Sequence, residues 1–132
     1  MRALPYLGVL CLMQGALASD PAASFKTVTW TGWFSNRDCA VARAKAGIFT
    51  ETNPDCSEQR IRKGEAAVFI SEQAKAIYLV QGYASVIDDL GYHLEIRARV
   101  DEQAKTMQIE SVKRLEWTAL ACARPRKKDT AK

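Results

Sequence analysis

A strict two-residue alternation in residues 92–100 constrains the fold of this chain more than any other feature. In "YHLEIRARV" the apolar residues Leu94, Ile96, Ala98 and Val100 alternate with polar or charged ones. A period of two is that of a β-strand with one face in a core. The segment therefore predicts a half-buried strand. Its outward face carries His93, Glu95, Arg97 and Arg99.

Four further segments carry the same pattern or a short β-rich apolar run. The first is residues 25–34, "FKTVTWTGWF". One of its faces holds Thr29, Thr31 and Trp33. Gly32 within it suggests a bulge or a tight bend. The other predicted strands are residues 66–71 and 76–82, joined by the turn "EQAK", and residues 106–117, which follow the turn "DEQAK".

The connections between these strands predict little helix. Residues 35–54 show no sustained period and end in the turn signal "TNPD". A short helix then fits the capping-box spacing of Asp55 and Glu58, and Gly64 stands where that helix would stop. Residues 84–91, "ASVIDDLG", predict a turn or a single helical turn ended by glycine.

Five short strands within a hundred residues, mostly joined by tight turns, indicate the fold class. They predict an all-β fold with one or two short helices, and the strand order is similar to that of an OB-fold, a small five-stranded barrel. We place this OB-like barrel domain at residues 25–118. Residues 19–24 would form a linker before it.

Both ends of the chain differ in composition from this domain. Residues 1–18 hold one charge, Arg2, before an apolar run that ends in Ala-Leu-Ala, the small-x-small pattern of a signal-peptidase site. We expect a cleaved signal peptide rather than a retained anchor, because the run is short for a membrane span. The protein would then be periplasmic or secreted, with no transmembrane segment after cleavage. Basic residues gather at the C-terminal end, and residues 119–132 predict a disordered tail.

Three stretches of the domain carry a family resemblance. They are "TWTGWFSNRDC", "DCSEQRIRKGEAAVFI" and "LGYHLEIRARVDEQAKTMQIESVK", which together span about residues 27–113. They resemble a family of small secreted bacterial domains of unknown function, which opens with Thr-Gly-Trp-x-Ser-Asp/Asn-x-x-Cys. That family often has a second helix cysteine where this chain has Arg60, and histidines near its first cysteine that "NRDCAVARA" lacks. The resemblance implies no established activity, and a metal or haem site would lack its ligands here.

Export would leave three cysteines, Cys39, Cys56 and Cys122, in an oxidising compartment. Cys39 follows the first strand and Cys56 begins the short helix, so a disulfide between them would hold the intervening loop on the barrel. Closing such a loop is worth about 3 kcal/mol in the chain-entropy account. The lack of a C-x-x-C motif favours a structural bridge over a redox-active pair. Cys122 would be a free thiol, an intermolecular bridge or a competing partner for either of the others.

No catalytic constellation emerges from the remaining residues. The chain has no serine-nucleophile motif, P-loop or dinucleotide fingerprint, and the acidic pair Asp88 and Asp89 is adjacent in a turn. Scattered cysteines and the single His93 do not supply a zinc site. We therefore expect no catalytic residue, no metal, no cofactor and no enzyme activity.

One candidate ligand face remains, on the strands. OB-folds bind oligonucleotides or sugars on aromatic, basic faces, and Trp33 could share such a face with Arg97 and Arg99. The alternative is that Trp33 packs in the core or rim and that the arginines only solubilise the surface. We expect a non-enzymatic binding module for an anionic ligand, a sugar or an envelope protein, and do not expect nucleic acid. The alternative function is a protein–protein interaction element that uses the barrel surface, Cys122 and the basic tail.

Overall fold

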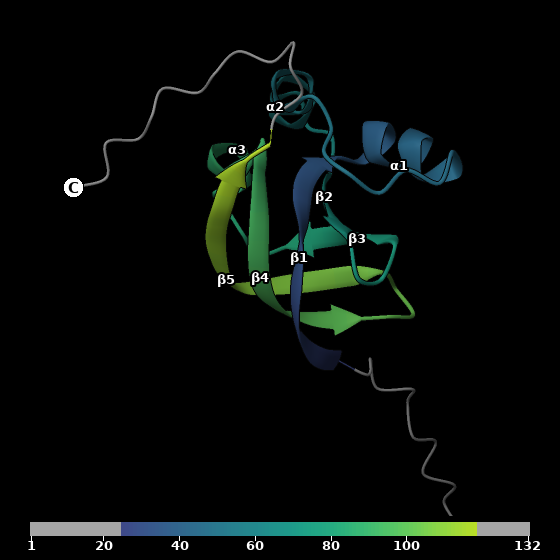
Figure 1. Cartoon of the computed structure of the whole chain (residues 1–132), viewed down its shortest axis with the longest axis vertical. Coiled ribbons are helices and arrows are strands. Elements are labelled where there is room, and N and C mark those ends of the chain that lie inside the picture. The colour runs from purple at the N-terminus through teal and green to yellow at the C-terminus, as the bar shows by residue number, and fades with distance from the viewer. Residues whose placement is uncertain (1–24, 119–132) are drawn as a thin grey trace, which may run out of the picture.

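Five strands and three short helices make up residues 25–118, the part of the chain that the computed structural model describes (Figure 1). The strands are β1 (Phe25–Asn36), β2 (Ala67–Ser71), β3 (Ala76–Gln81), β4 (Tyr92–Asp101) and β5 (Thr106–Trp117). The helices are α1 (Arg37–Lys45), α2 (Pro54–Arg62) and α3 (Val86–Asp89). The predicted signal peptide, linker and basic tail lie outside the described residues.

The five strands close into a ring in the order β1-β2-β3-β5-β4, which confirms the predicted small all-β barrel. Neighbouring strands are antiparallel except β3 and β5, which run parallel. Helices α1 and α2 both belong to the connection between β1 and β2, and they lie at the upper end of the barrel in Figure 1. No helix within residues 25–118 is long and apolar enough to cross a bilayer.

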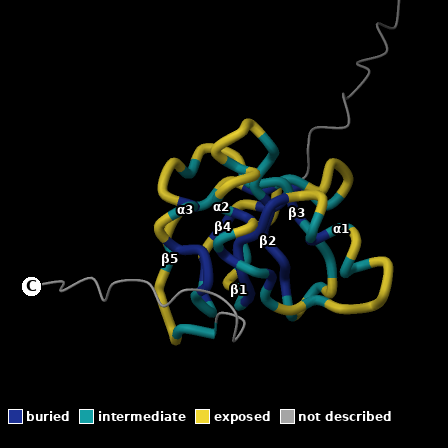
Figure 2. Tube along the Cα trace, turned by 90° about the horizontal axis from the view of Figure 1, so that it is seen from above, coloured by how far each residue is buried: buried dark blue, intermediate teal, exposed yellow. Residues whose placement is uncertain are grey.

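Alternate strand residues point into the barrel and form its core. The inward residues of β4, namely Leu94, Ile96, Ala98 and Val100, are fully buried, as the alternation predicts. The other strands and the α3 segment contribute Phe34, Phe69, Tyr78, Leu90 and Met107. Figure 2 shows the buried strands in the middle of the molecule and the exposed residues mainly in the loops around them.

Strand β1 changes partner at Gly32, which pairs with Leu94 of β4 on one side and with Ser71 of β2 on the other. There is no room for a side chain at this point. A Cβ atom on Gly32 would lie 1.8 Å from the carbonyl oxygen of Ile70 and 2.8 Å from the ring of Phe69. The glycine in the strand pattern therefore allows the β2 backbone to approach β1 closely.

Helix α1 lies in residues 35–54, where the sequence shows no sustained period and no helix is predicted. Its residues form no apolar stripe, and it is stabilised instead by covering the outer face of β2 and β3. Ala40 packs there on Val68 and Ile70. This outer cluster is completed by Phe49, Ile77 and Leu79. Strand β2 is therefore buried on both faces, which accounts for its unbroken apolar run.

Helix α2 begins earlier than predicted, because its N-cap is Asn53 and not Asp55. The side-chain oxygen of Asn53 accepts hydrogen bonds from the backbone N–H groups of Asp55 at 3.0 Å and Cys56 at 3.3 Å. Pro54 occupies the first helical position, where its missing N–H leaves no hydrogen bond unmade. Helix α3 confirms the single helical turn predicted in residues 84–91.

Candidate ligand-binding groove

The predicted ligand face, with Arg97 and Arg99, lies on the outer side of β4. Both arginines are exposed, but each already has a neighbour on the barrel surface. The Nε atom of Arg97 lies 3.2 Å from a carboxylate oxygen of Glu110 on β5. The guanidinium of Arg99 lies over the ring of Phe25, 5.1 Å from its centroid.

Trp33 does not lie beside these arginines. Arg97 pairs with Thr29, well before Trp33 along β1. The Trp33 side chain is only 7 % exposed, and its ring stacks on His93 at a centroid distance of 4.7 Å. Its indole N–H donates a hydrogen bond to the hydroxyl of Thr118 at 2.7 Å. Trp33 therefore packs at the rim of the barrel, where little of its ring is left for a ligand.

His93 points outward from β4, yet most of its side chain is enclosed. The side chain keeps 19 % exposure. Its Nε2 atom contacts a carboxylate oxygen of Glu72, and its Nδ1 atom lies 3.7 Å from Glu116. With Trp33 stacked on the ring, this imidazole joins the β2–β3 turn to β4 and β5.

Asp89 of the acidic pair has structural partners. It is 5 % exposed, and its carboxylate accepts hydrogen bonds from Arg114 Nε at 2.8 Å and from the hydroxyl of Tyr83 at 2.6 Å. Burial, together with the hydrogen bond to Asp89, raises the pKa of Tyr83 to about 12. These contacts fix the α3 segment on β5.

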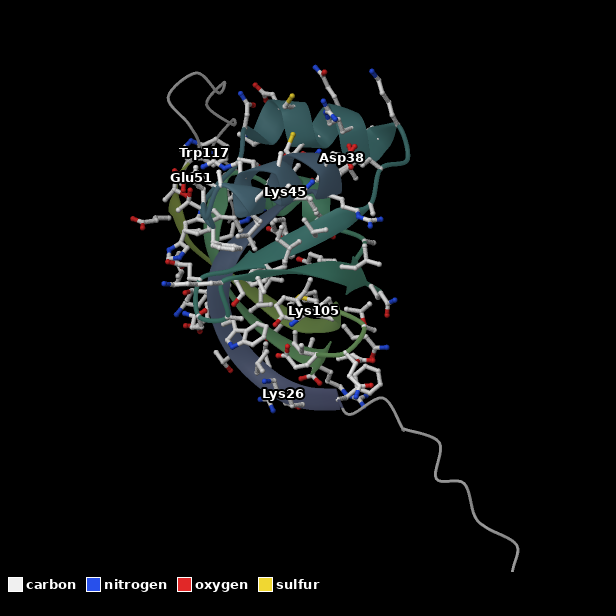
Figure 3. All side chains as sticks on the ribbon, turned by 90° about the vertical axis from the view of Figure 1, so that its right-hand side faces the viewer. Lys26, Asp38, Lys45, Glu51, Lys105 and Trp117 are labelled. Atoms are coloured by element: carbon white, nitrogen blue, oxygen red, sulfur yellow. The ribbon has the colours of Figure 1, made fainter. Side chains whose placement is uncertain are left out.

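A groove beside α1 offers concave space for a ligand. Its cavity has a volume of about 290 Å³. The apolar part of its lining consists of Val41, Val68, Ile77, Leu79 and Ala104, and the cationic part of Arg37 and Lys105. Figure 3 looks onto this side of the molecule, with Lys45 on α1 above β2 and β3, and Lys105 below these two strands. The groove thus lies between α1, the outer face of β2 and β3, and the β4–β5 turn.

Cationic side chains border this groove on two sides. Arg37, the first residue of α1, stands at one border, and Lys105 of the β4–β5 turn stands at the other. Lys45 lines an adjoining hollow together with Arg37. No ion pair found within residues 25–118 involves Arg37 or Lys45, whereas Lys105 lies 3.1 Å from Glu102. The Arg37 border is therefore the more open to an anion.

Glu102 holds Lys105 in place through a small network of charges. Its carboxylate lies 3.0 Å from Lys26 Nζ and 3.1 Å from Lys105 Nζ, and it accepts a hydrogen bond from the Tyr78 hydroxyl at 2.9 Å. Burial alone would raise the pKa of Glu102, but the hydrogen bonds from Lys26, Lys105 and Tyr78 lower it to about 2. Glu102 is therefore ionised near neutral pH and ties the β4–β5 turn to β1 and β3.

Cys39 and Cys56 line another cavity, which lies between α1 and α2. Its volume is about 330 Å³, and its lining is completed by Ala42, Arg43, Thr52 and Asn53. Both thiols are free in the structure, so the predicted disulfide stays a prediction. Cys56 is exposed and Cys39 is half-buried. Cys122 lies outside the described residues.

The geometry defines the class of fold: a closed, five-stranded all-β barrel with a helical excursion that builds a groove on β2 and β3. Within residues 25–118 no three His, Cys, Asp or Glu side chains gather closely enough to hold a metal ion. Compared with models of protein families, with curated proteins and with solved structures, the chain matches none of them. The resemblance to a secreted bacterial family therefore stays a prediction.

Proposed function

We propose that this protein is a non-enzymatic binding module whose groove beside α1 takes a small ligand with an apolar body and an anionic group. The observation that carries the proposal is the groove itself, an apolar floor bordered by Arg37 and Lys105. Small-molecule sites are typically concave and mostly apolar, with a few polar groups that fix the orientation of the ligand.

Charge and size narrow the ligand class. The exposed guanidinium of Arg37 can hold a carboxylate or a phosphate group through two parallel N–H donors. Val41, Ile77 and Leu79 would contact the apolar body. A volume of about 290 Å³ lies just below the usual range for ligand pockets, so a short chain or a single ring fits better than a polymer.

The surface around Arg97 and Arg99 is the weaker candidate for an anion site. A ligand there would have to compete with Glu110 for Arg97 and with the Phe25 ring for Arg99. The aromatic partner expected for stacking, Trp33, is itself buried against His93. In the groove beside α1, Lys105 is likewise paired with Glu102, but Arg37 has no ion pair within residues 25–118 and is open to an anion.

We place this module in the periplasm or outside the cell, as the apolar run and Ala-Leu-Ala ending of residues 1–18 indicate. In that oxidising compartment Cys39 and Cys56 would be bridged. The motif resemblance supports membership of a family of small secreted bacterial domains. Intact-mass analysis and peptide mapping of exported protein test both steps; a retained N-terminus or two free thiols would contradict them.

Ligand binding is tested by titrating the full chain with linear alkyl carboxylates and alkyl phosphates, and with alcohols of matched chain length as neutral controls. The anions should raise the unfolding temperature, and the alcohols should not. Arg37→Gln should weaken anion binding about tenfold or more, because a charge-assisted pair is lost. Arg97→Gln, an exposed arginine on another face, is the matched control and should bind normally. Absence of binding, or equal loss in both variants, would remove the groove as the site.

A second candidate function, a protein–protein interaction element, is favoured by one surface feature. Leu115, near the end of β5, is a large apolar residue with 42 % exposure. In this alternative the barrel surface, Cys122 and the basic tail would contact a partner. Size-exclusion chromatography and non-reducing gels of the full chain, beside a Cys122→Ser variant, would show whether the chain associates and whether that thiol links copies.

A further inference from the structure

Cys39 and Cys56 occupy equivalent places in two neighbouring helices. Each is the third residue of its helix, Cys39 in α1 and Cys56 in α2, and both line the same cavity of about 330 Å³. In Figure 3 α2 lies higher than α1, the helix that carries the labelled Asp38 and Lys45. The two thiols, one near the start of the connection between β1 and β2 and the other in α2, thus line one cavity.

Arg60 of α2 is a cation that interacts with both cysteines. Electrostatic interaction with Cys39, and then with Glu65 and Cys56, raises the pKa of Arg60 above its ordinary value. The Nη1 atom of Arg60 also lies 3.9 Å from carboxylate oxygens of Asp38 and Glu65. A thiolate formed at either cysteine would therefore be stabilised by the positive charge of this guanidinium.

The two thiols differ in access to solvent. Cys56 is exposed, whereas Cys39 is half-buried in the cavity wall. A reagent from solution therefore meets Cys56 first. Cys39, which shares the cavity, can react next with whatever is attached to Cys56. This asymmetry is what separates an attacking thiol from a resolving thiol in exchange reactions.

We infer that Cys39 and Cys56 form a thiol–disulfide exchange site for low-molecular-weight disulfides, with Cys56 as the attacking thiol and Cys39 as the resolving thiol. Neither cysteine lines the groove beside α1, so this site is independent of the proposed ligand groove. The lack of a C-x-x-C motif favoured a structural bridge on the sequence alone; the cavity that both thiols line is the structural observation that favours exchange instead.

The reaction has two balanced steps. The Cys56 thiolate attacks one sulfur of a disulfide R–S–S–R, forms the mixed disulfide Cys56–S–S–R and expels one R–S⁻. The Cys39 thiolate then attacks the Cys56 sulfur, forms the Cys39–Cys56 bond and expels the second R–S⁻. The two cysteines lose two electrons, the reagent gains them, and the two cysteine protons end on the expelled thiolates.

Oxidised glutathione is the probe, applied to the reduced full chain in a background carrying Cys11→Ser and Cys122→Ser. Quenched samples are analysed by intact mass and by peptide mapping. The background chain should form the Cys39–Cys56 bridge and retain no glutathione. Cys39→Ser should trap a stable glutathione adduct at Cys56. In the Cys56→Ser chain, glutathione should add to Cys39 at least about tenfold more slowly than it adds to Cys56 in the Cys39→Ser chain.

Two charge variants test the part played by Arg60. Arg60→Gln should slow adduct formation at Cys56 in the Cys39→Ser chain. The matched control is Arg62→Gln, on the same helix. Arg62 is paired with Glu58 at 3.0 Å, and its loss should leave the rate of adduct formation unchanged. Near-ultraviolet circular dichroism checks that each variant is folded, and the rate difference between cysteines should vanish in urea. Equal rates at both cysteines of the folded chain, or glutathione kept at both in the background chain, would overturn the proposal.

Discussion

Gly32 is the residue where the smallest chemical change should have the largest effect. Gly32→Ala places a Cβ atom 1.8 Å from the Ile70 carbonyl oxygen, and relief requires the backbones of β1 and β2 to separate. We expect a loss of more than about 3 kcal/mol in the free energy of unfolding, measured in urea. The control is Gly47→Ala, which meets no atom within 4 Å and costs only about 1 kcal/mol for its positive φ. Equal losses would show that the close approach is not what requires glycine.

Glu102 should give the barrel part of its sensitivity to acid. Its pKa of about 2 in the folded protein lies below the ordinary value of about 4.3 for an unfolded chain. The carboxylate therefore stabilises the fold above about pH 4.3, and this contribution is lost as the pH falls towards 2. The side chain is 37 % exposed, so solvent screening keeps the effect small.

The measurement is the free energy of unfolding of the wild type and of Glu102→Gln between about pH 2 and pH 7. We expect the variant to be less stable near neutral pH, because Lys26 and Lys105 lose their anionic partner. The two curves should converge in acid. Parallel curves across the whole range would show that Glu102 contributes nothing through its charge.

At the scale of elements, the cap of α2 is a feature that competing sequence signals concealed. Asn53→Ala removes the acceptor for two backbone N–H groups and should lower stability by about 1 kcal/mol. Asn53→Ser keeps a capping oxygen and should restore most of the loss. Chemical denaturation of both variants checks this. If serine and alanine destabilise equally, the loss comes from the cavity that Asn53 lines and not from the cap.

The elements that could be predicted are those whose own residues carry a period or a turn signal. The alternation in residues 92–100 gave both the strand and its inward face, and "EQAK" gave the β2–β3 hairpin. Helix α1 carries no apolar stripe, and its N-cap residue makes no side-chain cap bond, so it depends on tertiary contacts. These are its packing on β2 and β3 and the Glu65 carboxylate, which accepts a hydrogen bond from the Asp38 backbone N–H at 2.8 Å. The one signal for it was indirect: the apolar run of β2 on both faces requires a cover.

For the candidate sites too, features encoded in local sequence could be predicted, and features that depend on packing between elements could not. The groove could not be predicted, because α1 forms one of its walls. Alternation placed Trp33 on the correct outer face, but its enclosure depends on His93 from β4 and on Thr118 after β5. For the cysteines, sequence order suggested a link across the loop, while the shared cavity and Arg60 depend on how α1 and α2 pack.

At the scale of the whole molecule, strand β2 takes part in two apolar clusters of unequal size, the barrel core and the outer cluster beneath α1. Inside, Phe69 belongs to the barrel core, which is built from all five strands. Outside, Val68 and Ile70 hold α1 through the small outer cluster. The loop before α2 is held by a buried hydroxyl cluster, in which Ser35 and Thr52 approach to 2.6 Å. With so few apolar contacts, the helical excursion should open more readily than the barrel.

Hydrogen exchange on the reduced full chain tests this division. The free energy of opening for amides of α1 should be at least about 1 kcal/mol lower than that for amides of β1 and β4. Phe69→Leu, on the inner face of β2, should lower only the protection of the barrel, because an open excursion leaves its contacts intact. Ile70→Val, on the outer face, should lower both, because its contacts with α1 are lost in either opening. If Phe69→Leu lowers the protection of α1 and the barrel together, the molecule opens as one cooperative unit and the helices are part of its core.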